Sequence, residues 1–104
     1  MVTSYYRYLD DAEKNSIDDK GVILSRSGLT WFTPDRYETA AEAEKFLALA
    51  SARKWRIGPI PSDEMPDFDT VPLRPVAPAH GQPGGGVECA TSHPIYLFKV
   101  VELP

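Results

Sequence analysis

The chain has 104 residues, of which 42% are hydrophobic and 25% are charged, and its formal net charge is −4. This composition is that of a soluble globular protein, and the length predicts a single domain, residues 1–104, with little room for a second core. The negative charge argues against broad binding to nucleic-acid phosphates, no apolar run approaches a membrane span, and the N-terminus lacks a signal-peptide pattern.

Residues 4–9 are rich in aromatic side chains and predict the first strand. Strand alternation places Tyr5, Arg7 and Leu9 on one face, and Tyr6 and Tyr8 on the other. An arginine in a half-buried strand needs an anion, because burial of an unpaired guanidinium is costly. We expect a carboxylate of the protein, which is the commoner answer, or a ligand phosphate.

A short acidic helix of about 10 residues follows, opened by Asp10 with Glu13 and stopped at Gly21. Its apolar stripe, Ala12 and Ile17, is weak, so we expect it on the surface. Residues 22–24 predict a short buried strand, 25–28 a turn, and 29–33 a third strand that ends at Pro34 and Asp35.

A second helix is predicted from the capping pair Thr39 and Glu42 to about Ala52. Its apolar face consists of Ala40, Ala43, Phe46, Leu47 and Ala50.

The C-terminal half is dominated by proline, since nine of the ten prolines lie from Pro59 onward. Proline excludes helix and limits a sheet to short edge strands, for which residues 55–57 and 71–76 are candidates. Residues 60–70 predict an acidic loop. The run 95–101 is almost continuously apolar, so we expect it in the centre of the sheet.

A glycine-rich loop, residues 80–86, leads directly into Glu88 at the start of an apolar strand. Three consecutive glycines remove every Cβ and let other groups approach the backbone closely. A carboxylate at such a junction is placed on a rigid support, which suits catalysis, although an exposed surface glutamate is the simpler interpretation.

Three features on separate strands supply complementary chemistry: Arg7, the segment Trp31-Phe32-Thr33, and Glu88. They offer a phosphate partner, an aromatic platform for a planar ring, and a carboxylate. Cleavage of a glycosidic bond passes through an oxocarbenium-like state that a carboxylate stabilises. The set therefore suits the binding of a dinucleotide and the cleavage of its glycosidic bond.

The order of these motifs resembles a known family. The matching segments are Tyr5-Tyr6-Arg7, Gly28-x-Thr30-Trp31-Phe32-Thr33, Phe46-Leu47-Ala48-Leu49 and Gly81-Gln82-Pro83-Gly84-Gly85-Gly86-Val87-Glu88. They are similar to small ADP-ribosyltransferase domains at the C-terminal ends of bacterial polymorphic toxins, including Rhs-type effectors. The nearest likeness is to the TreTu-like group of the arginine-serine-glutamate class. This resemblance implies an α+β fold with a split, mostly antiparallel sheet around an NAD cleft and one or two short helices.

The resemblance also implies an activity: NAD is the donor, nicotinamide is released, and ADP-ribose is transferred to a target protein. By motif position, Arg7 contacts the dinucleotide, Thr33 supplies the hydroxyl that closes the second motif, and Glu88 is the catalytic glutamate. Many transferases of this kind carry Glu or Gln two residues before the catalytic glutamate, where this chain has Gly86. The acceptor is therefore left open, and simple NAD hydrolysis or guidance by Gln82 remain alternatives.

Further contacts are assigned from chemistry and proximity. Trp31, Phe32 and Tyr37 are candidates for the nicotinamide side, and His80 for a ligand contact at the start of the glycine loop. No metal is expected. One cysteine, Cys89, excludes an internal disulfide, and it has no familiar metal-ligand spacing with the histidines.

The family likeness extends to partners and location. It implies action in the cytoplasm of a target cell, delivery by a secretion system or as part of a larger protein, and a cognate immunity protein. Some related toxins modify elongation factor Tu, one candidate acceptor. The alternative of a different class is a non-enzymatic protein-binding module whose partner surface is formed by the proline-rich half and the acidic loop.

Overall fold

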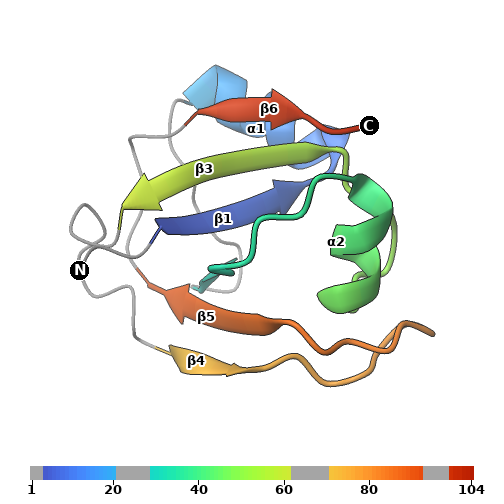
Figure 1. The fold of residues 1–104 in the computed structure, drawn as a ribbon. Coiled ribbons are helices and arrows are strands. Elements are labelled where there is room, and N and C mark those ends of the chain that lie inside the picture. The colour runs from blue at the N-terminus through green and yellow to red at the C-terminus, as the bar shows by residue number, and fades with distance from the viewer. Residues whose placement is uncertain (1–3, 21–28, 62–70, 93–98) are drawn as a thin grey trace.

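The computed structural model describes residues 4–20, 29–61, 71–92 and 99–104 and has an α+β fold, as predicted (Figure 1). Its elements are β1 (Ser4–Leu9), α1 (Asp11–Lys20), β2 (Thr30–Phe32), α2 (Ala40–Phe46), β3 (Trp55–Pro61), β4 (Val71–Pro75), β5 (Val87–Thr91) and β6 (Val100–Glu102). The strands form two antiparallel three-stranded sheets, ordered β1-β3-β6 and β2-β5-β4.

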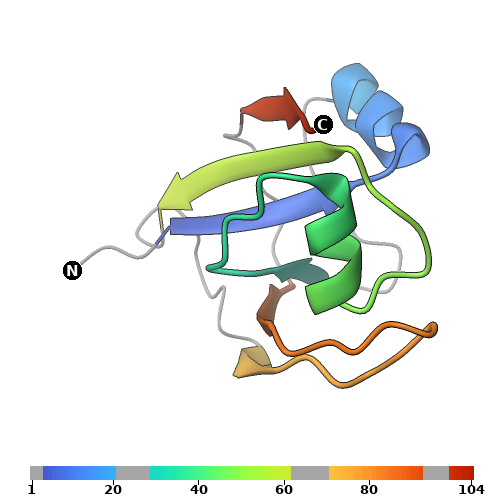
Figure 2. The ribbon, with the colours of Figure 1, turned by 45° about the vertical axis from the view of Figure 1, so that its right-hand side comes forward.

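The two sheets meet at Tyr6 of β1 and Thr33, the residue after β2. The Tyr6 amide donates to the Thr33 carbonyl at 2.8 Å, and the Thr33 amide donates to the Tyr6 carbonyl at 2.9 Å. One sheet continues from β1 to β3 and β6, and the other continues from β2 to β5 and β4, on the opposite side of this pair (Figures 1 and 2). The antiparallel part of the prediction is therefore confirmed, and the NAD cleft stays a prediction.

Strand β1 is buried on both faces, because its alternation supplies two separate apolar clusters. Tyr5 and Leu9 pack in one cluster, and Tyr6 and Tyr8 pack in the other, as the alternation predicts. The first cluster is completed by Ile17, Phe32, Ile57, Ile60 and Cys89, with Trp55 and Val100 against it. The second is completed by Ala43 and Leu103, with Tyr37 and Leu47 against it.

Helix α1 begins as predicted, since the Glu13 amide donates to Asp10 Oδ1 at 2.8 Å. The expectation of a purely surface helix is only half right. Ala12 is exposed, but Ile17 is 4% exposed and anchors the helix in the first cluster.

Helix α2 begins at the predicted cap, where Thr39 Oγ1 accepts from the Glu42 amide at 3.2 Å. It ends at Phe46 rather than near Ala52. Ala48 has a φ of 50° and is buried, so the chain leaves the helix in a left-handed turn. The expected apolar face is correspondingly shorter, and Ala50 is exposed.

Strand β3 is longer than predicted and central, although it contains Pro59 and Pro61. The prediction that proline would confine strands to edges is wrong here. The register explains the tolerance: Tyr5 faces Ile60 and Arg7 faces Ile57, so β3 has one extra residue in this stretch. Gly58 and Pro59, joined by a cis peptide bond, occupy this bulge, where a ladder hydrogen bond is not required.

The C-terminal strand is also placed differently. Among the described residues, β6 pairs with β3 at the edge of its sheet, whereas the apolar run 95–101 predicted a central strand. The predicted stop at Gly21, the strand 22–24, the turn 25–28, the acidic loop from residue 62 and residues 95–98 lie outside the described residues.

Candidate functional site

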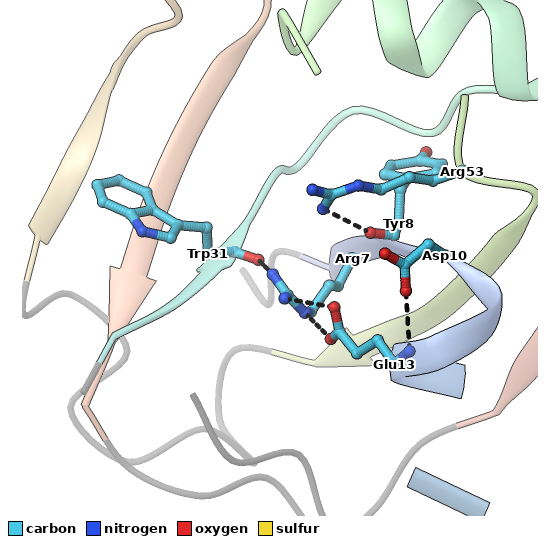
Figure 3. A network of polar contacts seen from close by, with 6 residues as sticks. All are labelled: Arg7, Tyr8, Asp10, Glu13, Trp31 and Arg53. Carbon is cyan, nitrogen blue, oxygen red and sulfur yellow. Dashed lines mark hydrogen bonds and ion pairs between the residues drawn. The ribbon is translucent and has the colours of Figure 1, made fainter. Parts of the chain in front are cut away.

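Arg7 points from β1 toward α1 and β2, and its guanidinium has three partners (Figure 3). Nε donates to Glu13 Oε2 at 2.8 Å, Nη2 donates to Glu13 Oε1 at 2.9 Å, and Nη1 donates to the Trp31 carbonyl at 3.0 Å. The Arg7 side chain is 17% exposed, and that of Glu13 is 27% exposed. The anion expected for Arg7 is therefore supplied by the protein, in a two-point ion pair that leaves part of the guanidinium open to water.

Trp31 lies on the opposite side of β2 from the core, and its ring points away from Arg7 (Figure 3). It faces Ala90 across the β2–β5 ladder. Arg74 of β4 lies over the indole, with Cζ 4.6 Å from the ring centroid, which is a cation–π contact.

Glu88 stands on the same face of this sheet, two residues from Ala90 and directly opposite Arg74. Arg74 Nε lies 3.4 Å from Glu88 Oε1, and the two side chains are 55% and 26% exposed. The contact is with Oε1 rather than Oε2 of the carboxylate.

These contacts form one continuous path that we name the Trp31 relay, consisting of Glu13, Arg7, Trp31, Arg74 and Glu88. Within it, Arg7 donates a hydrogen bond to the Trp31 carbonyl. Arg74, whose guanidinium lies over the Trp31 ring, contacts Glu88. The structure thus connects residues predicted from three separate motifs: Arg7 contacts the backbone of Trp31, and Glu88 is linked to the Trp31 ring through Arg74.

The glycine loop determines which residue faces Glu88. Its tip is a tight turn in which Ala79 and Gln82 exchange two backbone hydrogen bonds. Farther along, the Gly85 amide donates to the Val76 carbonyl, and the Val76 amide donates to the Gly86 carbonyl. Gly85 and Gly86 therefore both oppose Val76, and Gly85 has a φ of 102°, so the loop contains a β-bulge.

The same loop is fastened to the C-terminal end of α2. The Gly84 amide donates to the Lys45 carbonyl at 3.1 Å, and the Gly86 amide donates to the Phe46 carbonyl at 3.0 Å. These carbonyls lack partners within the helix, so the loop satisfies them. At Gly84 another group approaches the backbone closely, as expected for the glycine run, because an added Cβ would lie 2.5 Å from the Val76 carbonyl oxygen. For Gly81 and Gly85 the space is open.

Gly86 is glycine for a steric reason. An added Cβ would lie 2.7 Å from the Tyr37 hydroxyl oxygen and 3.1 Å from the Phe46 carbonyl oxygen. A side chain at residue 86 would therefore require the Tyr37 hydroxyl or the Phe46 carbonyl to move.

No protein-family model matches this chain, and no match is found among curated proteins or among solved structures. The geometry of the chain itself therefore carries the functional argument.

Phe32, Tyr37 and Thr33 are not gathered around the Trp31 ring. Phe32 is 2% exposed and packs in the first apolar cluster, on the opposite face of the sheet. Thr33 is also 2% exposed, and its Oγ1 accepts from the Asp35 amide at 3.0 Å. Tyr37 stacks on Phe46 with the ring centroids 5.6 Å apart. The three side chains therefore make contacts within the fold rather than with the Trp31 ring.

Tyr8 and Tyr37 form a buried hydroxyl network beside the loop. Tyr8 Oη accepts from the Tyr37 amide at 2.6 Å and donates to the Asp35 carbonyl at 3.1 Å. Tyr37 Oη donates to Asp35 Oδ2 at 3.2 Å. Burial raises the pKa of Tyr8 to about 12, and burial together with the Asp35 carboxylate raises the pKa of Tyr37 further. Both hydroxyls therefore stay protonated at neutral pH and act as donors.

His80 and Gln82 belong to the tip of the arm that extends from β4 and β5 (Figure 1). His80 is exposed and has a φ of 53°, next to Gly81 with a φ of 76°, so the two residues form the turn itself. Gln82 is half-buried beside it. Neither joins the Trp31 relay.

Two further observations concern the described residues alone. They contain no group of three His, Cys, Asp or Glu side chains arranged to hold a metal ion. No helix among them is long and apolar enough to cross a membrane.

Sequence reasoning missed Glu13 as the partner of Arg7 and Arg74 as the partner of Glu88. The capping pattern identifies Glu13 only as a residue of the helix start. Because α1 follows β1 directly, its first turn lies beside that strand, where Glu13 meets Arg7. For Arg74, the signal is hairpin pairing. Counting outward from the His80-Gly81 turn would place Leu73 opposite Glu88, and the bulge at Gly85 moves Arg74 there.

Proposed function

We propose that this chain is a mono-ADP-ribosyltransferase that cleaves the nicotinamide–ribose bond of NAD and transfers ADP-ribose to a protein in the cytoplasm of a target cell. The observation that carries the proposal is the Trp31 relay. It joins Arg7, Trp31 and Glu88, the residues that motif order alone had nominated, at the junction of a split sheet.

In this proposal Glu88 acts at the bond that breaks. Its Oε2 accepts a hydrogen bond from a ribose hydroxyl, and its charge stabilises the oxocarbenium-like state as the bonding electrons leave with nicotinamide. A nucleophile of the acceptor then bonds to the ribose carbon and loses its proton to solvent. If water takes the place of the acceptor, the same site hydrolyses NAD.

Arg7 and Trp31 contribute binding. The Arg7 guanidinium has five N–H donors, of which three are used by Glu13 and the Trp31 carbonyl. The remaining donors suit a phosphate oxygen of the dinucleotide. Arg74 covers one face of the Trp31 indole, so in this proposal a planar ring of the dinucleotide stacks on the other face.

A test compares nicotinamide release from NAD by the wild type and by Glu88→Gln, each with and without cell lysate. The substitution keeps the size of the side chain and removes its charge, so we expect release to fall at least about 100-fold. Glu102→Gln, on an exposed carboxylate of β6, is the matched control and should keep full activity. Full activity of Glu88→Gln would refute the proposal.

A second candidate, a non-enzymatic binding module, is favoured by one feature of the proline-rich half. Leu73 lies on β4, which is an edge strand among the described residues, with 52% of its surface exposed, and an edge strand can pair with a strand of another protein. Folded protein that releases no nicotinamide, with or without lysate, supports this candidate. Release that depends on lysate supports transfer over hydrolysis.

A further inference from the structure

Arg74 has no role in the motifs that led to the proposed function, yet it touches two of their residues. Its guanidinium rests on the Trp31 ring and reaches Glu88 Oε1. We infer that Arg74 is a positioning residue that fixes the orientation of the Glu88 carboxylate, an inference that rests on the proposed function.

The backbone is built to bring these two residues together. Successive residues of a strand point to opposite faces, so Val71 and Arg74, three apart, would normally face opposite sides. The β4–β5 register instead pairs Val71 with Ala90 and Arg74 with Glu88, so β4 carries one extra residue between these pairs. This bulge turns Arg74 onto the face of Glu88, and the bulge at Gly85 sets the register on its other side.

The contact geometry suits positioning. Arg74 approaches the Glu88 carboxylate at Oε1, with Nε 3.4 Å away, so it contacts one edge of that group. The guanidinium is planar and lies against the indole, which restricts where it can move, whereas a lysine at this place would keep the charge without the flat stacking surface. An ion pair between exposed side chains is weak by itself, so the indole contact is needed to make the orientation of Glu88 persist.

The kinetic test uses Arg74→Gln and Arg74→Lys, with Arg36→Gln as the matched control. Arg36 is likewise exposed and pairs with Glu38 at 3.0 Å, away from the relay. For Arg74→Gln we expect kcat for nicotinamide release to fall about 10-fold to 100-fold with KM nearly unchanged, because the carboxylate is misplaced. Arg74→Lys should recover part of the loss. An unchanged kcat, or a lower KM without loss of kcat, would show instead that Arg74 merely covers the Trp31 face.

A second readout does not depend on activity. The indole N–H signal of Trp31 in an NMR spectrum should shift in Arg74→Gln and stay in place in Arg36→Gln. An unmoved signal would overturn the contact itself. Failure of the wild type to cleave NAD would instead refute the proposed function, so the two failures are distinguishable.

Discussion

Arg7 and Glu13 form a two-point ion pair that ties β1 to the first turn of α1, with Nε to Oε2 at 2.8 Å and Nη2 to Oε1 at 2.9 Å. Since both side chains are largely buried, removal of one leaves the other with an uncompensated charge. The pair therefore couples the stability of the N-terminal segment to the residue that we propose binds the dinucleotide.

The first prediction separates these two roles. Arg7→Ala and Glu13→Gln should each lower the free energy of unfolding, by about 1–3 kcal/mol, measured by urea denaturation. Only Arg7→Ala should also weaken NAD binding measured by calorimetry, because Glu13→Gln keeps the guanidinium. Equal NAD affinity in the two variants would confine Arg7 to a structural role.

The second prediction concerns Trp31. Trp31→Phe keeps an aromatic face for Arg74 and a planar ligand, whereas Trp31→Leu keeps only apolar bulk. We expect NAD affinity to decrease in the order wild type, Phe, Leu, with the Leu variant at least about tenfold weaker, which corresponds to about 1.4 kcal/mol. Trp55→Phe is the control, because the Trp55 indole donates a hydrogen bond to Asp11 and takes no part in the Trp31 relay. Wild-type affinity of Trp31→Leu would contradict the platform.

The third prediction tests why residue 86 is glycine. Gly86→Ala should destabilise the fold by about 1–3 kcal/mol, since the new Cβ meets the Tyr37 hydroxyl and the Phe46 carbonyl. Tyr37→Phe removes the hydroxyl, so the alanine should cost less in the double variant than alone. The four unfolding free energies form a double-mutant cycle. Strictly additive values would show that the Tyr37 hydroxyl does not limit the position.

The fourth prediction is a loss of stability at alkaline pH. Burial raises the pKa of Tyr8 to about 12, above the ordinary tyrosine value of 10.0. Its contribution to stability is therefore complete below about pH 10 and is lost as the pH rises toward about 12, because the unfolded chain releases the proton first. Thermal unfolding at several pH values measures the decline, and Tyr8→Phe should make it shallower. Tyr37, whose pKa is also raised, contributes in the same direction.

Local patterns in the sequence predict much of the fold correctly. The alternation of β1 and the caps at Asp10 and Thr39 depend on neighbouring residues, and the structure confirms them. The end of α2 depends on a loop about 40 residues away that binds its last carbonyls, so helical periodicity continued the predicted helix too far.

The candidate site likewise combines features that short sequence patterns predict with features that depend on distant residues. The positions of Arg7, Trp31 and Glu88 on strands follow from short motifs, and their convergence required the split sheet. The pairing of Arg74 with Glu88 depends on two bulges, each of which adds one residue to one strand. Periodicity alone cannot predict that pairing, because one added residue moves a side chain to the other face.

The bulge at Gly85 implies that the identity of residue 85, rather than the length of the glycine run, selects the neighbour of Glu88. With all residues kept and no bulge, a hairpin counted from the His80-Gly81 turn pairs Glu88 with Leu73, an apolar side chain, whereas the bulge pairs it with Arg74. The bulge places residue 85 at a φ of 102°, which residues with a side chain rarely adopt. A substitution at Gly85 that abolishes the bulge would therefore exchange a charged neighbour of Glu88 for an apolar one, while deletion of Gly85 would remove the extra residue and keep Arg74 opposite Glu88.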